Sequence, residues 1–350
     1  MNAYVKTSLL CGVAVLLALA LGEALVRLMG YGPWAYQTLD ANEPVLHEPH
    51  PVRGWVNRPG RHHIPPYHPE DDSIRISILA GGQRSTRRTV TDDAAEEVLV
   101  VGGSYTQGWA ISDDATYAWQ LQAAHPQYHF HNLGVGGYGT YQSLLAMEEA
   151  LPTLRRPALV LYGFMYHHPA RNVAPGSWLR TLTTYSRRGH VAVPYATLGP
   201  SDSTLIRFQP TRYQLWPLAE QLAFVNLANR AYHRAMTYRR SQQQHAVTER
   251  LMAEMQATAT AYGADFRVVL LAAPDDITTA YTAFLDEAGI PYIDCVEPLT
   301  DDLRVRGEGH PNGVLNRRWA ACISEGLGWD SMPSNSASES SRGGAFGLAE

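Results

Sequence analysis

The stretch from Glu97 to Tyr117 reads EVLVVGGSYTQGWAISDDATY, and the fold of the chain is organised around it. It starts with the short apolar run Val98–Val101, which is followed directly by the triplet GGS at 102–104. A short apolar run closed by glycines is typical of a buried parallel strand. Ser104 is therefore expected where a strand gives way to a turn and a helix. That point lies at the carboxyl edge of a sheet, where open α/β sheets bind their ligands.

The composition is that of an ordinary folded protein with one large core, because 45% of the 350 residues are hydrophobic and 17% are charged. The formal net charge of -5 gives no basic footprint, so nucleic acid is not an expected partner. The three cysteines lack the spacing of metal ligands, and no metal or organic cofactor is expected. Cys295 and Cys322 either pair, if the domain lies outside the cytoplasm, or remain two buried thiols.

Residues 1–30 indicate a signal anchor or a signal peptide. They contain an apolar segment broken near its end by Glu23 and Arg27, and about 20 apolar residues span a bilayer. The unbroken run Leu9–Gly22 has the length of a signal-peptide core and includes a small-residue cleavage site. The helical pattern continues to Leu28, which favours an uncleaved anchor. Both alternatives export the rest of the chain to the periplasm or the cell surface.

Residues 31–95 are rich in Pro, Gly and His, and they predict a lead-in with short strands, one of them at Ser73–Leu79. From 96 to 329, apolar runs alternate with helical stretches, which predicts a parallel sheet covered by helices on both faces. An insertion at about 173–247 interrupts this alternation. The Ser- and Gly-rich tail 330–350 is expected to be disordered.

The elements expected within residues 96–329 follow from these patterns. The expected strands are Val98–Val101, His129–Val135, Ala158–Tyr162, Phe266–Ala272 and Pro291–Cys295. The expected helices are Tyr117–Ala124, Tyr141–Leu151, Thr248–Tyr262 and Asn316–Leu327.

A serine hydroxyl becomes an effective nucleophile when a histidine accepts its proton and an acid orients that histidine. Among the 14 histidines, His310 lies in the polar loop RGEGHPNG at 306–313, between the last strand and the closing helix. This loop leaves the same sheet edge as Ser104, and Glu308 precedes the histidine by two residues. A turn whose Gly, Pro and Asn residues only make the connection is the alternative.

Acyl transfer also needs hydrogen-bond donors aimed at the developing oxyanion. The run GVGGYGT at 134–140 follows the second strand and offers unencumbered backbone N–H groups at the same edge. Such a run can also hold a phosphate, but its spacing is neither G-x-G-x-x-G nor a P-loop. The third strand exits into YGFMYHHPARN at 162–172, from which a polar side chain can supply a third donor.

The blocks at 102–108, 132–140, 167–172 and 308–312 together resemble the SGNH (GDSL-like) hydrolase superfamily. The resemblance covers roughly residues 97–328. It implies a flavodoxin-like three-layer α/β/α fold with a parallel sheet, preceded here by an N-terminal transmembrane helix.

The same resemblance implies roles for individual residues. Ser104 is the implied nucleophile, and His310 and Glu308 are the implied base and acid of the triad. Gly137 and the backbone N–H of the serine are implied members of the oxyanion hole.

Three positions depart from the family pattern. Gly103 stands where the first block has Asp, and Glu308 replaces the Asp of the triad. The Gly-Asn-Asp of the third block is absent, and counting back from Asn172 puts His167 in the place of Asn and His168 in that of Asp. A histidine N–H can donate to an oxyanion, so His167 is the expected substitute; otherwise the site is weakened or serves another acceptor. Losing one such donor lowers the rate about 100- to 1000-fold.

Other candidate residues have structural explanations. His125, His129 and His131 flank the start of a strand, where surface or packing roles are expected and a zinc site is the alternative. Trp109 is a candidate for lining a substrate cleft. The following aromatic residues of the insertion are expected in the core: Trp178, Tyr185, Tyr195, Tyr213 and Trp216.

These observations predict a membrane-anchored, extracytoplasmic serine esterase or O-acetyltransferase that acts on acyl, above all acetyl, esters of cell-envelope carbohydrate. Carbohydrate is inferred from export and from the habits of the family, not from any residue. The alternative is a non-catalytic module of the same fold that binds envelope glycan or a partner protein, and the missing asparagine motivates it. A phospholipid-directed lipase is a third possibility, because the anchor keeps the domain near lipid.

Overall fold

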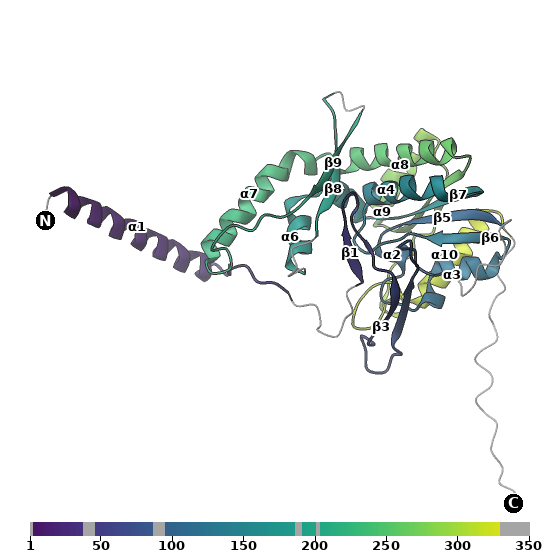
Figure 1. Cartoon of the computed structure of the whole chain (residues 1–350), viewed down its shortest axis with the longest axis horizontal. Helices are drawn as coiled ribbons and strands as arrows, with labels where there is room; N and C mark the ends of the chain where they lie inside the picture. Colours follow the sequence, from purple (N-terminus) through teal and green to yellow (C-terminus); the bar gives the residue numbers. More distant parts are fainter. Residues whose placement is uncertain (1–2, 38–45, 87–94, 186–190, 201–203, 330–350) are drawn as a thin grey trace, which may run out of the picture.

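The computed structural model describes residues 3–37, 46–86, 95–185, 191–200 and 204–329, and its centre is a five-stranded parallel sheet (Figure 1). The tail 330–350, expected to be disordered, lies outside these residues. The strands are β5 (Glu96–Gly102), β6 (Tyr128–Asn132), β7 (Pro157–Met165), β10 (Asp265–Ala272) and β11 (Tyr292–Asp294). Their spatial order is β6-β5-β7-β10-β11, which is the flavodoxin-like order 2-1-3-4-5. The predicted fold class is confirmed.

Helices cover both faces of the sheet, with α4 and α8 on one side and α3 and α10 on the other (Figure 1). The first layer consists of α4 (Thr140–Ala150), α8 (Gln244–Ala261) and α9 (Asp275–Ala288). The second layer consists of α3 (Tyr117–Ala124) and α10 (Gly313–Gly326). Three short 3-10 turns are η1 (Asp113–Ala115), η2 (Leu151–Thr153) and η3 (Asp301–Leu303).

Strand β5, which lies between β6 and β7, is buried on both faces, and this explains its unbroken apolar run. Val98 and Val100 pack into the core beneath α3 and α10, while Leu99 and Val101 pack into the core beneath α4 and α8. Each of these four side chains is at most 1% exposed. Successive side chains of a strand point to opposite faces, so two covered faces require apolar residues at every position.

Several element ends differ from the sequence-based expectation; for example, β7 runs on to Met165 and α8 begins at Gln244. Two differences have a clear physical reason. Strand β6 ends at Asn132 instead of Val135, because the chain then bends toward β5 and the N–H of Val135 donates to the Gly102 carbonyl at 3.1 Å. Helix α9 was not expected. Its apolar stripe is short and includes the buried pair Tyr281 and Leu285, which are four residues apart among exposed polar residues.

The lead-in consists of two antiparallel hairpins at the carboxyl edge of the sheet. One joins β1 (His47–His50) to β2 (Gly54–Asn57), and the other joins β3 (Gly60–Ile64) to β4 (Ile74–Ile78). The predicted strand at Ser73–Leu79 is thus present as β4. The N–H of Arg84 donates to the Asn132 carbonyl at 2.8 Å, which joins the lead-in to the end of β6.

Five elements lie in the chain between β7 and α8, where the insertion was expected. They are α5 (His168–Asn172), α6 (Gly176–Thr184), β8 (Val193–Leu198), β9 (Leu205–Thr211) and α7 (Ala223–Ser241). Its aromatic side chains divide between core and surface. Tyr213 is buried as expected, and Trp178 and Tyr195 pack partly buried beside it. The expectation is wrong for Tyr185 and Trp216, which are 46% and 37% exposed.

Helix α1 (Ala3–Leu28) is long and apolar enough over Tyr4–Leu28 to cross a membrane, although a signal sequence has the same length and composition. Its end meets the start of α7 (Figure 1). The Glu23 carboxylate accepts the N–H groups of Ala223 and Phe224, each at 2.9 Å. The first N–H groups of a helix have no acceptor within the helix, so Glu23 caps α7 and ties α1 to the body.

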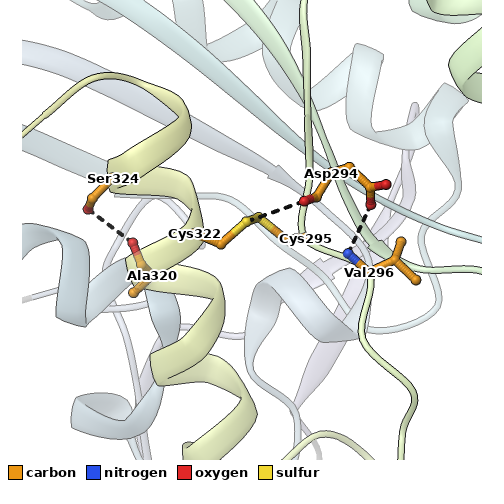
Figure 2. Close-up of a disulfide and its surroundings, with 6 residues drawn as sticks. All are labelled: Asp294, Cys295, Val296, Ala320, Cys322 and Ser324. Atoms are coloured by element: carbon orange, nitrogen blue, oxygen red, sulfur yellow. Dashed lines mark hydrogen bonds between the residues drawn. A yellow bond between two sulfur atoms is a disulfide. The ribbon is translucent and has the colours of Figure 1, made fainter. Parts of the chain in front are cut away.

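The structure pairs Cys295 with Cys322, a choice that the sequence left open. Cys295 follows β11 and Cys322 lies on α10, as Figure 2 shows. Their Cα atoms are 5.9 Å apart, and 27 positions separate them in the chain. The bridge therefore ties the closing helix to the edge strand of the sheet.

Removing this bridge is expected to lower the free energy of unfolding by about 3 to 4 kcal/mol, because a closed loop of this length restricts the unfolded chain. Urea unfolding of Cys295→Ser with Cys322→Ser, compared with the native protein, measures the change. The control is Cys11→Ser, since Cys11 is a free, exposed cysteine. Equal midpoints for the double variant and the control would contradict the pairing.

Candidate active site

Ser104 is the first residue of the short helix α2 (Ser104–Gln107), which starts directly after β5 and its N-cap Gly103. The turn needs glycine because the backbones approach closely. A Cβ atom on Gly102 would lie 2.8 Å from the carbonyl oxygen of Gly163 on the neighbouring strand β7. Gly108 then ends the helix in the left-handed conformation, with φ of +74°. The serine is thereby fixed at the carboxyl edge of the sheet and is 5% exposed.

The structure brings together the three residues that were expected to form a triad. The Ser104 hydroxyl lies 3.0 Å from Nε2 of His310, although the residues are 206 positions apart. Nδ1 of His310 lies 2.7 Å and 2.9 Å from the two carboxylate oxygens of Glu308. A carboxylate only accepts hydrogen bonds, so Nδ1 carries the proton of the neutral ring. Nε2 is then free to accept the proton of the serine hydroxyl.

The Glu308 carboxylate is held by three donors. Besides the ring of His310, it accepts the His310 backbone N–H at 2.8 Å and the indole N–H of Trp109 at 3.1 Å. Burial acts to raise the pKa of Glu308, but the hydrogen bonds and the charge of His310 outweigh it and lower the pKa below its usual value. Trp109 therefore helps to hold the acid in its ionised form, while its expected place in a substrate cleft stays a prediction.

The loop around His310 also forms the connecting turn that was the alternative explanation for its Gly, Pro and Asn residues. Gly309 adopts a left-handed conformation with φ of +97°, which folds Glu308 back onto the histidine. Asn312 caps α10 by accepting the N–H groups of Val314 and Leu315 at 2.9 Å and 3.2 Å. The turn and the His–Glu contact are thus features of one loop.

The glycine run beside the serine presents a free backbone N–H at Gly137. The Gly136 carbonyl accepts the indole N–H of Trp55 at 2.9 Å. The N–H of a trans peptide points opposite to its carbonyl, so the Gly137 N–H points away from Trp55. Within the described residues this N–H has no hydrogen-bond acceptor, and that of Ser104, at the start of a helix, has none within the helix.

The third block does not place an asparagine at the serine. The amide of Asn172 is buried and bonded to Tyr141, Thr140 and Thr248 at 2.8 to 2.9 Å, which fixes α5 against α4 and α8. His168 is fully buried, with Nδ1 2.7 Å from the hydroxyl of Tyr162.

His167 is exposed and packs on Tyr166, with ring centroids 3.9 Å apart. Desolvation and the charges of Arg171 and His310 lower the pKa of His167 to about 4, so its ring is neutral at pH 7. The described contacts include no hydrogen bond from this ring to Ser104 or Gly137. Its role as an oxyanion donor stays a prediction.

The sequence analysis did not identify several residues that position the loops of the site. Asn57 and Arg84 come from the lead-in, and Gln107 comes from α2. Asn57 donates to the Gly134 carbonyl at 2.9 Å and accepts from Gln107 at 2.8 Å, which joins the glycine run to α2. Arg84 donates to carbonyl groups in the turn after α2. These residues stand in no recognisable motif; only the polar types amid a Pro- and Gly-rich segment hinted at them.

The remaining histidines pack as neighbours of polar groups. His125 lies 2.8 Å from the Ser324 hydroxyl, and His131 lies 3.1 Å from a carboxylate oxygen of Glu97. Glu97, His129 and His131 offer possible metal-ligand atoms within 4.8 Å of one another. They are the one group of three or more such side chains in the part of the chain that the structure describes. The carboxylate of Glu97 already accepts two backbone N–H groups, at 2.7 and 2.9 Å. The expectation that the protein needs no metal stays a prediction.

Comparison with known proteins gives likenesses of fold. No protein-family model matches the chain, and no curated protein matches it. Among solved structures, it is similar to a lipolytic protein of the G-D-S-L family from Veillonella parvula, with 12% identity and a TM-score of 0.39 over 66% of this chain and 97% of that one. A putative lipolytic protein of the same family from Desulfitobacterium hafniense gives 11% identity and a TM-score of 0.39 over 66% and 99%. The structure of TesA gives 14% identity and a TM-score of 0.36 over 66% of this chain and 98% of that one.

The layers and the strand order define this chain as an α/β protein with a flavodoxin-like sheet. This sheet order is the one that the sequence resemblance to SGNH hydrolases implied. Sequence identities this low identify no substrate and no reaction.

Replacing Trp109 by Phe is expected to weaken the hold on Glu308. The pKa of Glu308 is lowered in the folded protein, so losing a donor raises it, and the acid then protonates at a higher pH as the pH falls. The reactivity of Ser104 toward a fluorophosphonate should fall about tenfold at neutral pH, as for a hydrogen bond of about 1.5 kcal/mol to a charged group. In a plot of this reactivity against pH, the fall on the acidic side should move to higher pH. Trp216→Phe is the control, and an unchanged profile would contradict this role.

Proposed function

We propose that the protein is a serine hydrolase that cleaves acyl esters. The observation that carries the proposal is the contact of 3.0 Å between the Ser104 hydroxyl and His310, whose other ring nitrogen is bound to Glu308. A serine activated in this way attacks acyl carbonyl groups. Nothing in the arrangement requires a metal or an organic cofactor.

The reaction has two halves. The Ser104 oxygen attacks the acyl carbonyl while Nε2 of His310 takes the hydroxyl proton, and the carbonyl oxygen becomes an oxyanion that Gly137 and the serine N–H stabilise. Collapse of this intermediate expels the alcohol, which receives the proton from His310. In the second half, water or a sugar hydroxyl gives its proton to His310 and attacks the acyl-serine, which frees the serine. Glu308 keeps the imidazole oriented and stabilises its charged form.

We further propose that the domain acts outside the cytoplasm, held to the membrane by α1. The apolar helix supports this location, and so does the bridge between Cys295 and Cys322, because disulfides persist in oxidising compartments. We propose acetyl esters of cell-envelope carbohydrate as its substrates, on the grounds of this location and of the resemblance to SGNH hydrolases. Whether water or sugar accepts the acyl group distinguishes an esterase from an O-acetyltransferase with the same residues.

The alternative of a non-catalytic module that binds glycan or a partner protein makes the opposite prediction for turnover. Its motivation was the missing asparagine of the third block. The intact Ser-His-Glu contacts favour the enzyme, because a binding module has no need for a serine hydroxyl paired to an oriented imidazole.

Ser104→Ala and His310→Ala are each expected to lower the hydrolysis of p-nitrophenyl acetate at least about 1000-fold, because the nucleophile and the base act as one unit. Release of p-nitrophenol measures the rate. Ser177→Ala and His63→Ala are matched controls at exposed positions and should retain full activity. Wild-type protein without turnover would favour the binding module. Full activity in Ser104→Ala would exclude the assigned nucleophile.

A further inference from the structure

Arg171 is a cation without a counter-ion beside the serine. It lies in α5, is partly buried, and its guanidinium donates through Nη1 to the Tyr138 carbonyl at 2.9 Å. Its Cζ atom lies 4.9 Å from the ring centroid of Trp178. Within the described part of the chain, no carboxylate lies at ion-pair distance from it. Burial lowers the pKa of Arg171 to about 10, so the side chain remains charged at neutral pH.

The guanidinium lies between the two chain segments that carry the free N–H groups. On one side, Nη1 is 3.4 Å from the point where a Cβ atom of Gly103 would stand, and Gly103 directly precedes the nucleophile. On the other side it holds Tyr138, which directly follows Gly137. The charge therefore lies beside both chain segments that carry these N–H groups.

A buried cation is costly to desolvate, and hydrogen bonds or a paired anion offset that cost. The described residues supply no such anion, whereas acyl transfer at Ser104 creates one at each half-reaction. Four of the five N–H donors of the guanidinium remain after the bond to Tyr138. Charged donors form stronger hydrogen bonds to oxyanions than neutral amides do.

We propose that Arg171 donates to the oxyanion formed at Ser104, in place of the asparagine that the third block lacks. This inference rests on the proposed function and assigns the third donor of the same site. Arg171 then acts on the transition state, where the negative charge develops, and not on the neutral ester that binds first.

The test compares kcat and KM for p-nitrophenyl acetate, a neutral ester. Arg171→Gln should lower kcat about 100- to 1000-fold and leave KM within about twofold. Arg171→Lys keeps the charge but loses the forked geometry of the guanidinium. Its kcat should lie between those of the native protein and of Arg171→Gln. Affinity for a boronic acid that mimics the tetrahedral intermediate should drop by the same factor as kcat, since both carry the oxyanion.

Two controls separate chemistry from structure. Arg240 is a matched arginine that donates to the Ala174 carbonyl at 2.6 Å and lies 4.1 Å over Tyr195, so Arg240→Gln loses the same kinds of contact and should keep its kcat. In Arg171→Ala, added guanidinium ion should restore part of kcat, which a merely structural role would not allow. The rival donor is tested by His167→Ala.

Each outcome decides the assignment of Arg171. A wild-type enzyme that turns over while Arg171→Gln keeps its kcat overturns it and leaves the proposed function intact. So does a loss of kcat in His167→Ala alone, or a loss in Arg171→Ala that guanidinium does not restore. A wild-type protein without any turnover overturns the proposed function itself, and the assignment of Arg171 with it.

Discussion

A fully buried guanidinium, that of Arg84, holds the turn on which the site depends. It donates to the Gln107 carbonyl at 2.8 Å and to the Ile111 carbonyl at 2.5 Å, and its Nε lies 3.1 Å from the Asp113 carboxylate. The last carbonyl groups of a helix have no partner within the helix, and the very short α2 has little else to bind them. Burial lowers the pKa of Arg84, and the neighbouring Asp113 carboxylate opposes part of that shift. A buried charge of this kind is tolerable only when its hydrogen bonds are satisfied, and here they fix the serine turn.

The lead-in therefore belongs to the site although it lies outside the sheet. Trp55 holds the Gly136 carbonyl, Asn57 joins Gly134 to α2, and Arg84 closes the turn after the serine. Each contact is a side chain satisfying a backbone carbonyl group at the carboxyl edge. The sheet brings the loops to one edge, and the lead-in sets the directions of their N–H groups.

The fold was predictable because its signals are local, whereas the contact of Ser104 with His310 also needed the family resemblance. An apolar run followed by glycines identified β5 and Ser104, and parallel topology sent the loop of His310 to the same edge. Arg84 and Trp55 were not predictable, since a side chain that binds a distant carbonyl leaves no periodic pattern in its own segment. Counting positions pointed to His167, but the chain turns into α5 there, so the spacing of the family motif no longer fixes where each side chain points.

The glycine at position 103 and the charge of Arg171 depend on each other. A Cβ atom at Gly103 would stand 2.8 Å from Nε2 of His168 and 3.4 Å from Nη1 of Arg171, so the aspartate of the first block has no room. An aspartate there would also place a carboxylate against the guanidinium and neutralise it. Glycine at 103 leaves the Arg171 guanidinium beside the serine turn without a carboxylate partner among the described residues. An acidic side chain at this position, as in the motif that the sequence resembles, is therefore incompatible with an unpaired cation next to Ser104.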